Sequence, residues 1–150
     1  MADDHWVFVI KVQDKPGALT AIASVFSSRG VSLDTTLGSS ANTSTIVLSF
    51  RATERKKETL FRTLQRLHQV QEVQAYPYNA RELRAIAIAR ITPETQTNFS
   101  PKQVQTEIIS ERGDSKTILL TGSTQAVDKV VQSLREHGCL LDVVTTVMAV

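Results

Sequence analysis

Apolar residues in the first half of the chain follow two patterns, one typical of buried strands and one of amphipathic helices. Residues 6–12 form a nearly continuous apolar run, which predicts a buried strand. Apolar positions then recur at the spacing of one helix face, at Leu19, Ile22, Ala23 and Phe26. Gly30 supplies a helix stop. The elements predicted after it are strands at 31–37 and 45–52, a helix at about 54–68 and a strand at 70–76.

The second half of the chain repeats this order after Pro77-Tyr78-Asn79, a segment typical of a boundary. A new apolar strand begins with Leu83, and a capping-box pattern at 100–103 predicts a short helix to about residue 105. Strands at 107–110 and 117–121 flank a turn that contains Gly113-Asp114. The last elements predicted are a helix with the apolar face Val127, Val130, Val131 and Leu134, a stop at Gly138 and a strand at 140–150.

These patterns predict an α+β protein made of two consecutive ferredoxin-like βαββαβ domains, at residues 1–78 and 79–150. Each domain is too small for a large core of its own, which favours paired or oligomeric sheets.

The turn Asp14-Lys15-Pro16-Gly17-Ala18-Leu19 lies between the first predicted strand and the first predicted helix. Pro16 suits the first helical position, and Gly17 lacks a Cβ, so a ligand can approach the backbone there closely. The free N–H groups of a first helical turn can hold a carboxylate. The alternative is that Pro-Gly only shapes a strand-to-helix turn.

Composition and charge exclude several classes of protein. The chain has 150 residues, of which 41% are hydrophobic and 21% are charged, and its net charge is +2. This balance by itself does not indicate nucleic acid or an anionic membrane as a partner. No apolar run approaches the roughly 20 residues of a membrane span, and the N-terminus lacks the pattern of a signal peptide, so we expect a cytoplasmic protein. The single cysteine, Cys139, is expected to be a small apolar residue of the last strand.

One basic cluster stands out on the second predicted helix, at Arg55, Lys56, Lys57, Arg62 and Arg66. These residues surround the apolar positions of that helix, so we interpret them as a solvated face rather than a phosphate-binding surface. An acidic partner protein is an equally suitable match for such a patch.

No motif for catalysis or metal binding accompanies the three histidines. His5 lies in the N-terminal lead-in, His68 at a helix end and His137 beside Gly138, and none has a partner motif for general-base catalysis. RNA binding is an alternative, because the RNA recognition motif has the same βαββαβ order. The strand at 45–52 lacks the basic and aromatic pattern of that motif, so Trp6, Phe8 and Phe50 are expected to be core or dimer contacts.

The turn Asp14–Leu19 after a first strand, followed by Arg29-Gly30-Val31-Ser32-Leu33, resembles the ACT domain, a regulatory module that binds amino acids. The chain as a whole resembles the small regulatory subunits of acetohydroxyacid (acetolactate) synthase. This resemblance rests on the segments 17–19, 26–30, 81–83, Ile108-Ile109 and 120–123. Where that family often has Asn, this chain has Asp14 and Ser32.

The resemblance implies a non-catalytic regulatory subunit of branched-chain amino acid biosynthesis, present as a homodimer or larger homo-oligomer. A valine-like amino-acid effector would bind at the ACT dimer interface. The residues implied to contact it are Asp14, Lys15, Pro16, Gly17, Ala18 and Leu19 of one chain and Val31 and Ser32 of the other. Asp14 would accept the ammonium group or cap the helix start, and Ser32 would bond the effector or be a strand-start hydroxyl.

The partner implied by the resemblance is the catalytic subunit of the synthase. No cofactor is expected on this chain, since thiamine diphosphate and a divalent metal would belong to that subunit, and neither nucleic acid nor membrane is expected as a partner. The competing hypothesis is a stand-alone ACT amino-acid sensor or protein-interaction module without a synthase partner.

Overall fold

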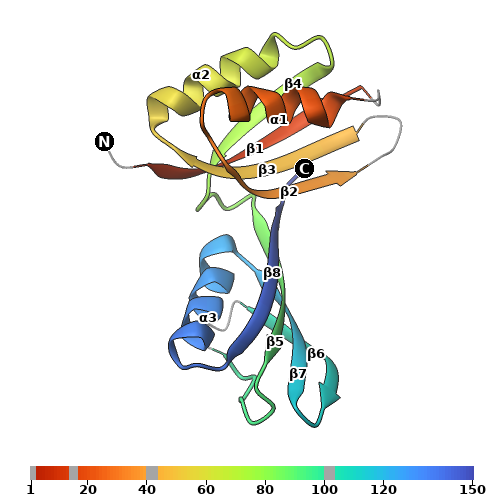
Figure 1. Ribbon diagram of the computed structural model, residues 1–150, viewed down its shortest axis with the longest axis vertical. Coiled ribbons are helices and arrows are strands. Elements are labelled where there is room, and N and C mark those ends of the chain that lie inside the picture. The colour runs from red at the N-terminus through yellow and green to blue at the C-terminus, as the bar shows by residue number, and fades with distance from the viewer. Residues whose placement is uncertain (1–2, 14–16, 40–43, 100–103) are drawn as a thin grey trace. The chain divides into compact units, whose positions relative to one another are not determined.

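The computed structural model of the chain describes residues 3–13, 17–39, 44–99 and 104–150. The chain divides into two compact units, one formed by residues 1–80 with 149–150 and the other by residues 81–148. Each unit contains one four-stranded sheet, so the α+β class predicted from the sequence is confirmed (Figure 1). No helix among the described residues is long and apolar enough to span a bilayer.

The first unit has the predicted order of strands and helices. Its elements are β1 (Asp4–Val12), α1 (Ala18–Ser28), β2 (Leu33–Ser39), β3 (Ser44–Ala52), α2 (Glu54–Gln65) and β4 (Val70–Pro77). The strands are antiparallel in the order β2-β3-β1-β4, so β2 and β4 form the two edges. β1 begins earlier than predicted, which places His5 inside the strand rather than in a lead-in. β2 begins at Leu33, so Val31 and Ser32 precede it.

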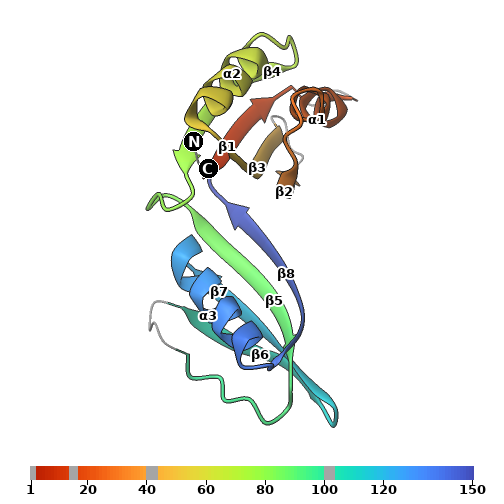
Figure 2. The same cartoon turned by 60° about the vertical axis from the view of Figure 1, so that its left-hand side comes forward.

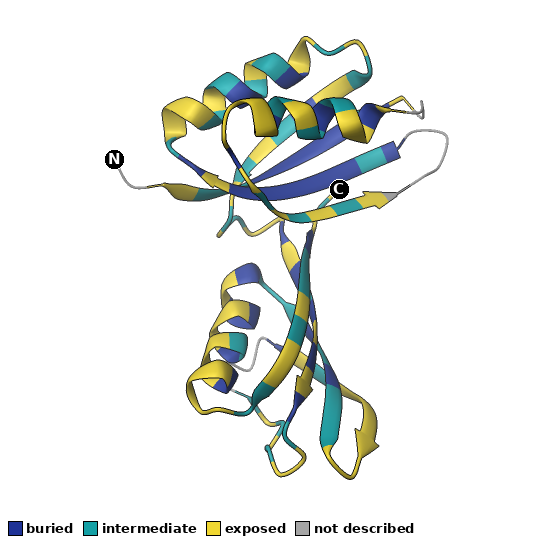
Figure 3. Cartoon of the chain, in the orientation of Figure 1, coloured by how far each residue is buried: buried dark blue, intermediate teal, exposed yellow. Residues whose placement is uncertain are grey.

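The core of the first unit lies between the sheet and its two helices (Figure 3). Phe8 of β1 and Phe50 of β3 are fully buried and pack edge to face, with ring centroids 4.8 Å apart. Phe26 of α1 packs on Phe50 in the same way at 5.0 Å. Trp6 contacts this core, and its indole N–H donates to the Ala52 carbonyl at 3.0 Å. Phe8 and Phe50 are therefore core residues without a face open to RNA bases, and Trp6 packs against this core from a partly buried position.

The second unit repeats the sheet. Its elements are β5 (Arg84–Ile91), β6 (Gln105–Arg112), β7 (Ser115–Gly122), α3 (Thr124–Glu136) and β8 (Leu140–Met148). The antiparallel order β6-β7-β5-β8 is equivalent to that of the first sheet. α3 covers one face of this sheet (Figure 2) and buries Val127, Val130 and Leu134, three of the four positions predicted for its apolar face. Cys139 precedes β8 and packs against the same core.

One element of the second unit differs from the prediction. Gln105 was expected at the end of a short helix that begins near residue 100, but it is the first residue of β6. Residues 100–103, which carry the capping-box pattern, lie outside the described residues. In the described part of the connection from β5 to β6, residues 92–99 and 104 form no helix. Phe99 and Val104 of this connection pack against the core instead, so residues without helical structure cover part of it.

Candidate effector site

The residue that precedes helix α1 is a glycine with an unusual backbone conformation. Gly17 is the N-cap residue, with φ 88° and ψ −3°, a left-handed conformation that favours glycine. A Cβ at this position would meet no described atom within 4 Å outside the neighbouring residues, so a side chain would find space there. The cap forms no side-chain hydrogen bond to the first turn, unlike Thr53 of α2 and Ser123 of α3.

The open cap leaves polar backbone groups without an intrahelical partner. The Gly17 carbonyl accepts from the Ala21 N–H at 2.9 Å and so closes the first helical turn. The N–H groups of the residues between them, which include Ala18 and Leu19, precede the first intrahelical donor. These groups and the helix dipole favour an anion at this end of the helix.

The structure corrects the predicted start of this helix. Pro16 was expected at the first helical position, but α1 begins at Ala18, two residues later. The left-handed conformation of Gly17 explains the difference, because it ends the incoming segment and cannot belong to a right-handed helix. Asp14, Lys15 and Pro16 lie outside the described residues.

The other predicted site residues differ in exposure. Ala18 is buried and belongs to the core of the first unit, whereas Leu19 next to it is 48% exposed. At the far end of α1, Val31 is buried and Ser32 is exposed. Val31 and Ser32 line a depression of about 440 Å³ that also includes Phe26 and Gly30. Ala18 and Val31 are thus held by packing, while Leu19 and Ser32 are accessible.

The described part of the predicted site falls into two groups within one chain. Gly17, Ala18 and Leu19 lie at the N-terminal end of α1, and Val31 and Ser32 follow its C-terminal end. An 11-residue helix separates the groups by about 16 Å. One free amino acid is too short to bridge that distance. A single effector therefore cannot contact both groups within one chain.

A charged cluster near the start of β2 was not predicted from the sequence. Asp34 Oδ2 lies 3.4 Å from His5 Nε2 and 3.9 Å from Arg51 Nε. The imidazole of His5 stacks on the ring of Tyr78, with centroids 3.7 Å apart. Burial lowers the pKa of His5, Arg51 lowers it further, and Asp34 opposes both. Since the four residues come from distant parts of the sequence, no local pattern indicates this cluster.

Possible metal ligands are scattered over the described part of the chain. There, no group of three or more His, Cys, Asp and Glu residues is arranged to hold a metal ion. His137 is the C-cap of α3, where its ring Nδ1 lies 2.7 Å from the Ser133 carbonyl oxygen. His68 follows the end of α2, as expected from the sequence.

Residues 8–72 match the family model of the AHAS small subunit-like ACT domain, where AHAS is acetohydroxyacid synthase. No curated protein sequence shows a significant match to the chain.

Solved structures extend the fold comparison to both units. The acetolactate synthase small subunit of Thermotoga maritima is similar with a TM-score of 0.72 and 19% identity, over 97% of this chain and 96% of that one. The regulatory subunit of aspartate kinase from Thermus thermophilus gives a TM-score of 0.52 at 10% identity, over 89% and 92% of the two chains. Aspartate kinase of Clostridium acetobutylicum gives 0.52 at 16% identity, over 89% of this chain and 32% of that one.

At these identities the structural matches establish the fold, and the family model establishes the type of the first unit. The N-terminal unit belongs to the family of AHAS small subunit-like ACT domains, and the chain as a whole has the fold of an acetolactate synthase small subunit.

Proposed function

We propose that this protein is the non-catalytic regulatory subunit of an acetohydroxyacid (acetolactate) synthase and binds a valine-like amino-acid effector between the ACT domains of two copies. The observation that carries the proposal is the open glycine cap of α1 in a domain of the small subunit-like type. It offers backbone N–H groups to a carboxylate, the group that all amino-acid effectors share.

In the proposed complex, the effector carboxylate accepts from the N–H groups of Ala18 and Leu19 of one chain. Ser32 of the second chain supplies a hydroxyl that can donate or accept one hydrogen bond. The exposed side chain of Leu19 supplies apolar surface for an aliphatic effector. Because a two-fold interface uses the same residues twice, a homodimer forms two such sites.

The regulation we propose is a coupling between two binding events. An effector that binds one arrangement of the dimer more tightly shifts an attached catalytic subunit toward the state that accompanies this arrangement. A coupling free energy of about 1–3 kcal/mol changes an affinity about 5- to 150-fold. Thiamine diphosphate and the divalent metal of the synthase belong, in this proposal, to the catalytic subunit.

The first test is a thermal-shift screen of the purified chain against the twenty amino acids. A ligand that binds only the folded state stabilises it by about 2.7 kcal/mol at one hundred times its dissociation constant. We expect valine, leucine or isoleucine to raise the melting temperature and D-valine to have a smaller effect. A response to a different amino acid would contradict the assignment to branched-chain biosynthesis, and no response to any would contradict the effector site.

The second test concerns the synthase partner. Co-expression of a tagged chain with the thiamine-diphosphate synthase subunit of the same organism is expected to yield a complex at low salt. An effector response without a complex would favour a stand-alone amino-acid sensor, which shares the site but lacks the catalytic partner.

A further inference from the structure

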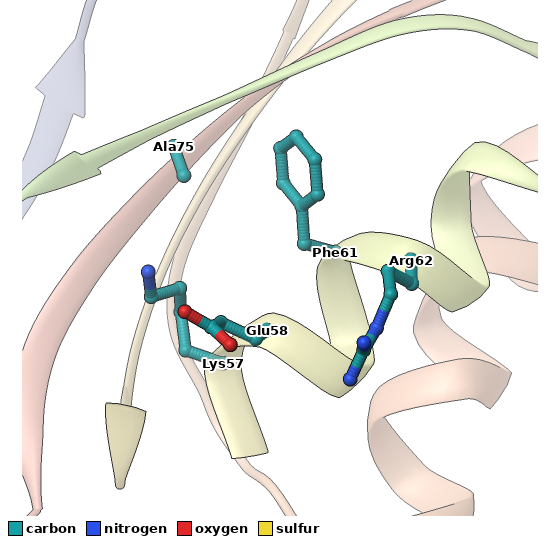
Figure 4. A pocket seen from close by; sticks show the side chains of 5 residues that line it. All are labelled: Lys57, Glu58, Phe61, Arg62 and Ala75. Carbon is teal, nitrogen blue, oxygen red and sulfur yellow. The ribbon is translucent and has the colours of Figure 1, made fainter. Parts of the chain in front are cut away.

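A second recess in the first unit lies away from the effector site, between helix α2 and the edge strand β4. Four side chains of α2 and one of β4 line it, namely Lys57, Glu58, Phe61, Arg62 and Ala75 (Figure 4). We call it the α2–β4 notch. Its volume is about 320 Å³, enough for an aliphatic side chain, and the ring of Phe61 projects toward β4 within it.

The strand beside the notch has an open edge. In the sheet order β2-β3-β1-β4, β4 pairs with β1 on one side and with no described strand on the other. The backbone N–H and C=O groups of such an edge can pair with an extended segment of another protein. Ala75 is exposed and lies opposite Phe8 in the sheet, so its Cβ is on the face that α2 covers.

The charge around the notch selects the kind of segment that fits it. α2 contains four cationic and two acidic residues, and Lys57 and Arg62 are both at the rim of the notch. The Lys57 ammonium lies 4.4 Å from the centroid of the Trp6 ring. Among the described residues, Arg62 has no ion-pair partner within 4.0 Å, and neither does Lys57. Two cations at the rim of an apolar recess are complementary to a peptide segment in which acidic side chains flank an apolar side chain.

We propose that the α2–β4 notch binds an extended acidic segment of a partner protein, which adds to β4 as a further strand. One aliphatic side chain of the segment fills the recess between Phe61 and Ala75. Acidic residues two positions before and after it point to the same face of the added strand and meet Lys57 and Arg62. The inference does not depend on the effector site, which lies at α1 and at the start of β2.

Charge argues against a second copy of this chain as the occupant. An added β4 would place Val73 and Ala75 on the face toward α2, and its one acidic residue, Glu72, on the opposite face. Two copies of α2 would also bring like charges together. Nucleic acid fits less well than protein, because an aliphatic group suits a recess of this kind and a phosphate backbone offers none.

The test uses the full chain and a short synthetic peptide in which Glu alternates with Thr around one central Leu. Trp6 is the single tryptophan of the chain, so its fluorescence reports on the neighbouring Lys57. We expect the peptide to change this fluorescence and to slow hydrogen exchange along β4. Replacing the central Leu by Ser, or the Glu residues by Lys, should abolish both effects.

Protein variants separate the apolar contribution from the charge. Ala75→Leu fills the recess, and R62E reverses one rim cation, so each should lower the peptide affinity at least about tenfold, or by about 1.4 kcal/mol. Glu58→Gln removes the acidic residue of the rim and should raise the affinity. Lys129→Glu on α3 is the matched control for R62E, because it reverses an exposed helical cation of the other unit and should leave the affinity unchanged.

Several outcomes would overturn the proposal. One is a folded Ala75→Leu protein that binds the peptide as the unaltered chain does. Peptide binding without slower exchange in β4 would contradict strand addition. Dimerisation that Ala75→Leu abolishes would identify a second copy as the occupant, and a single-stranded RNA that displaces the peptide would replace the protein partner with a nucleic acid.

Discussion

The two units of the molecule build equivalent sheets but connect their first two strands differently. In the first unit, α1 lies between β1 and β2, and its buried residues include Ile22 and Phe26. In the second unit, residues 92–104 connect β5 to β6, and Phe99 and Val104 contact the core from this segment. Both sheets nevertheless have the same strand order, so that order does not require a long first helix.

The N-cap of α1 also differs from the N-cap of α3. The N-cap of α1 is a left-handed glycine, and a Cβ on it would find no described atom within 4 Å outside the neighbouring residues. The helix of the second unit, α3, begins at Ser123, whose hydroxyl accepts from the Ala126 N–H at 3.2 Å. A side-chain cap accepts a hydrogen bond from an N–H group of the first turn, whereas a glycine cap leaves that N–H group available to a ligand. The anion binding that we propose would thus depend on one turn rather than on the topology.

The largest effect on stability is expected when a phenylalanine is replaced by alanine in the segments that connect the first two strands of each unit. Phe26→Ala should cost about 3–5 kcal/mol of unfolding free energy, because Phe26 is fully buried and packs against two other phenylalanines. Phe99→Ala should cost clearly less, since Phe99 is partly buried. Urea unfolding followed by circular dichroism measures both values. Equal costs would mean that the extended connection packs as tightly as the helix.

The next prediction concerns the turn that distinguishes the units. Gly17→Asp should abolish the stabilisation by effector, because its carboxylate occupies the place proposed for the effector carboxylate. A left-handed non-glycine residue also costs about 1–2 kcal/mol. Thermal-shift titration with the best amino acid of the screen checks the loss.

Gly113→Asp is the matched control for this variant. Gly113 lies in the turn between β6 and β7, does not have a positive φ and also has open space around it. This variant should retain the full effector response. If Gly17→Asp folds and retains it as well, the proposed site is wrong.

The fold was largely predictable because apolar periodicity is a local signal. Positions such as Val127, Val130 and Leu134 repeat at helix spacing, and the structure buries all three. The predicted helix near residue 100 was wrong at Gln105, because a capping box indicates a possible helix start and not the residues that follow it. Pro16 was misplaced because a turn motif does not specify which residue takes the left-handed conformation.

The site was less predictable than the fold. The Pro-Gly pattern predicted a turn, which the structure has at Gly17, but the pairing of Asp34 with His5 and Arg51 depends on three different strands. The α2–β4 notch likewise depends on Ala75 lying beside a helix more than ten positions away in the sequence. Such contacts follow from the register of the sheet, which a single sequence specifies only through its tertiary packing.

Removing the side-chain caps of α2 and α3 tests how much these caps stabilise the helices that have them. Ser123→Ala and Thr53→Ala should each cost about 1 kcal/mol, because each removes an acceptor for a first-turn N–H group. Ser133→Ala on the exposed face of α3 is the control and should change stability little. Chemical unfolding measures the differences. If Ser123→Ala costs no more than the control, the hydroxyl of Ser123 does not matter for the start of α3.

The smallest effect concerns the pH dependence of the first unit, which contains the partly buried His5. Its pKa is lowered in the folded state by burial and by Arg51, so the folded protein binds this proton less readily than the unfolded chain. The stability that neutral His5 contributes to the folded protein is therefore fully present above the unfolded pKa of about 6.5. This stability decreases as the pH falls below that value. Stability between about pH 7 and pH 5 should decrease more steeply than in His5→Phe, which retains a ring against Tyr78 without a titrating group. If the stability of His5→Phe changes with pH as steeply as that of the unaltered protein, other groups account for the acid sensitivity. The cluster of His5, Asp34 and Arg51 then does not make the first unit more acid-sensitive than the second.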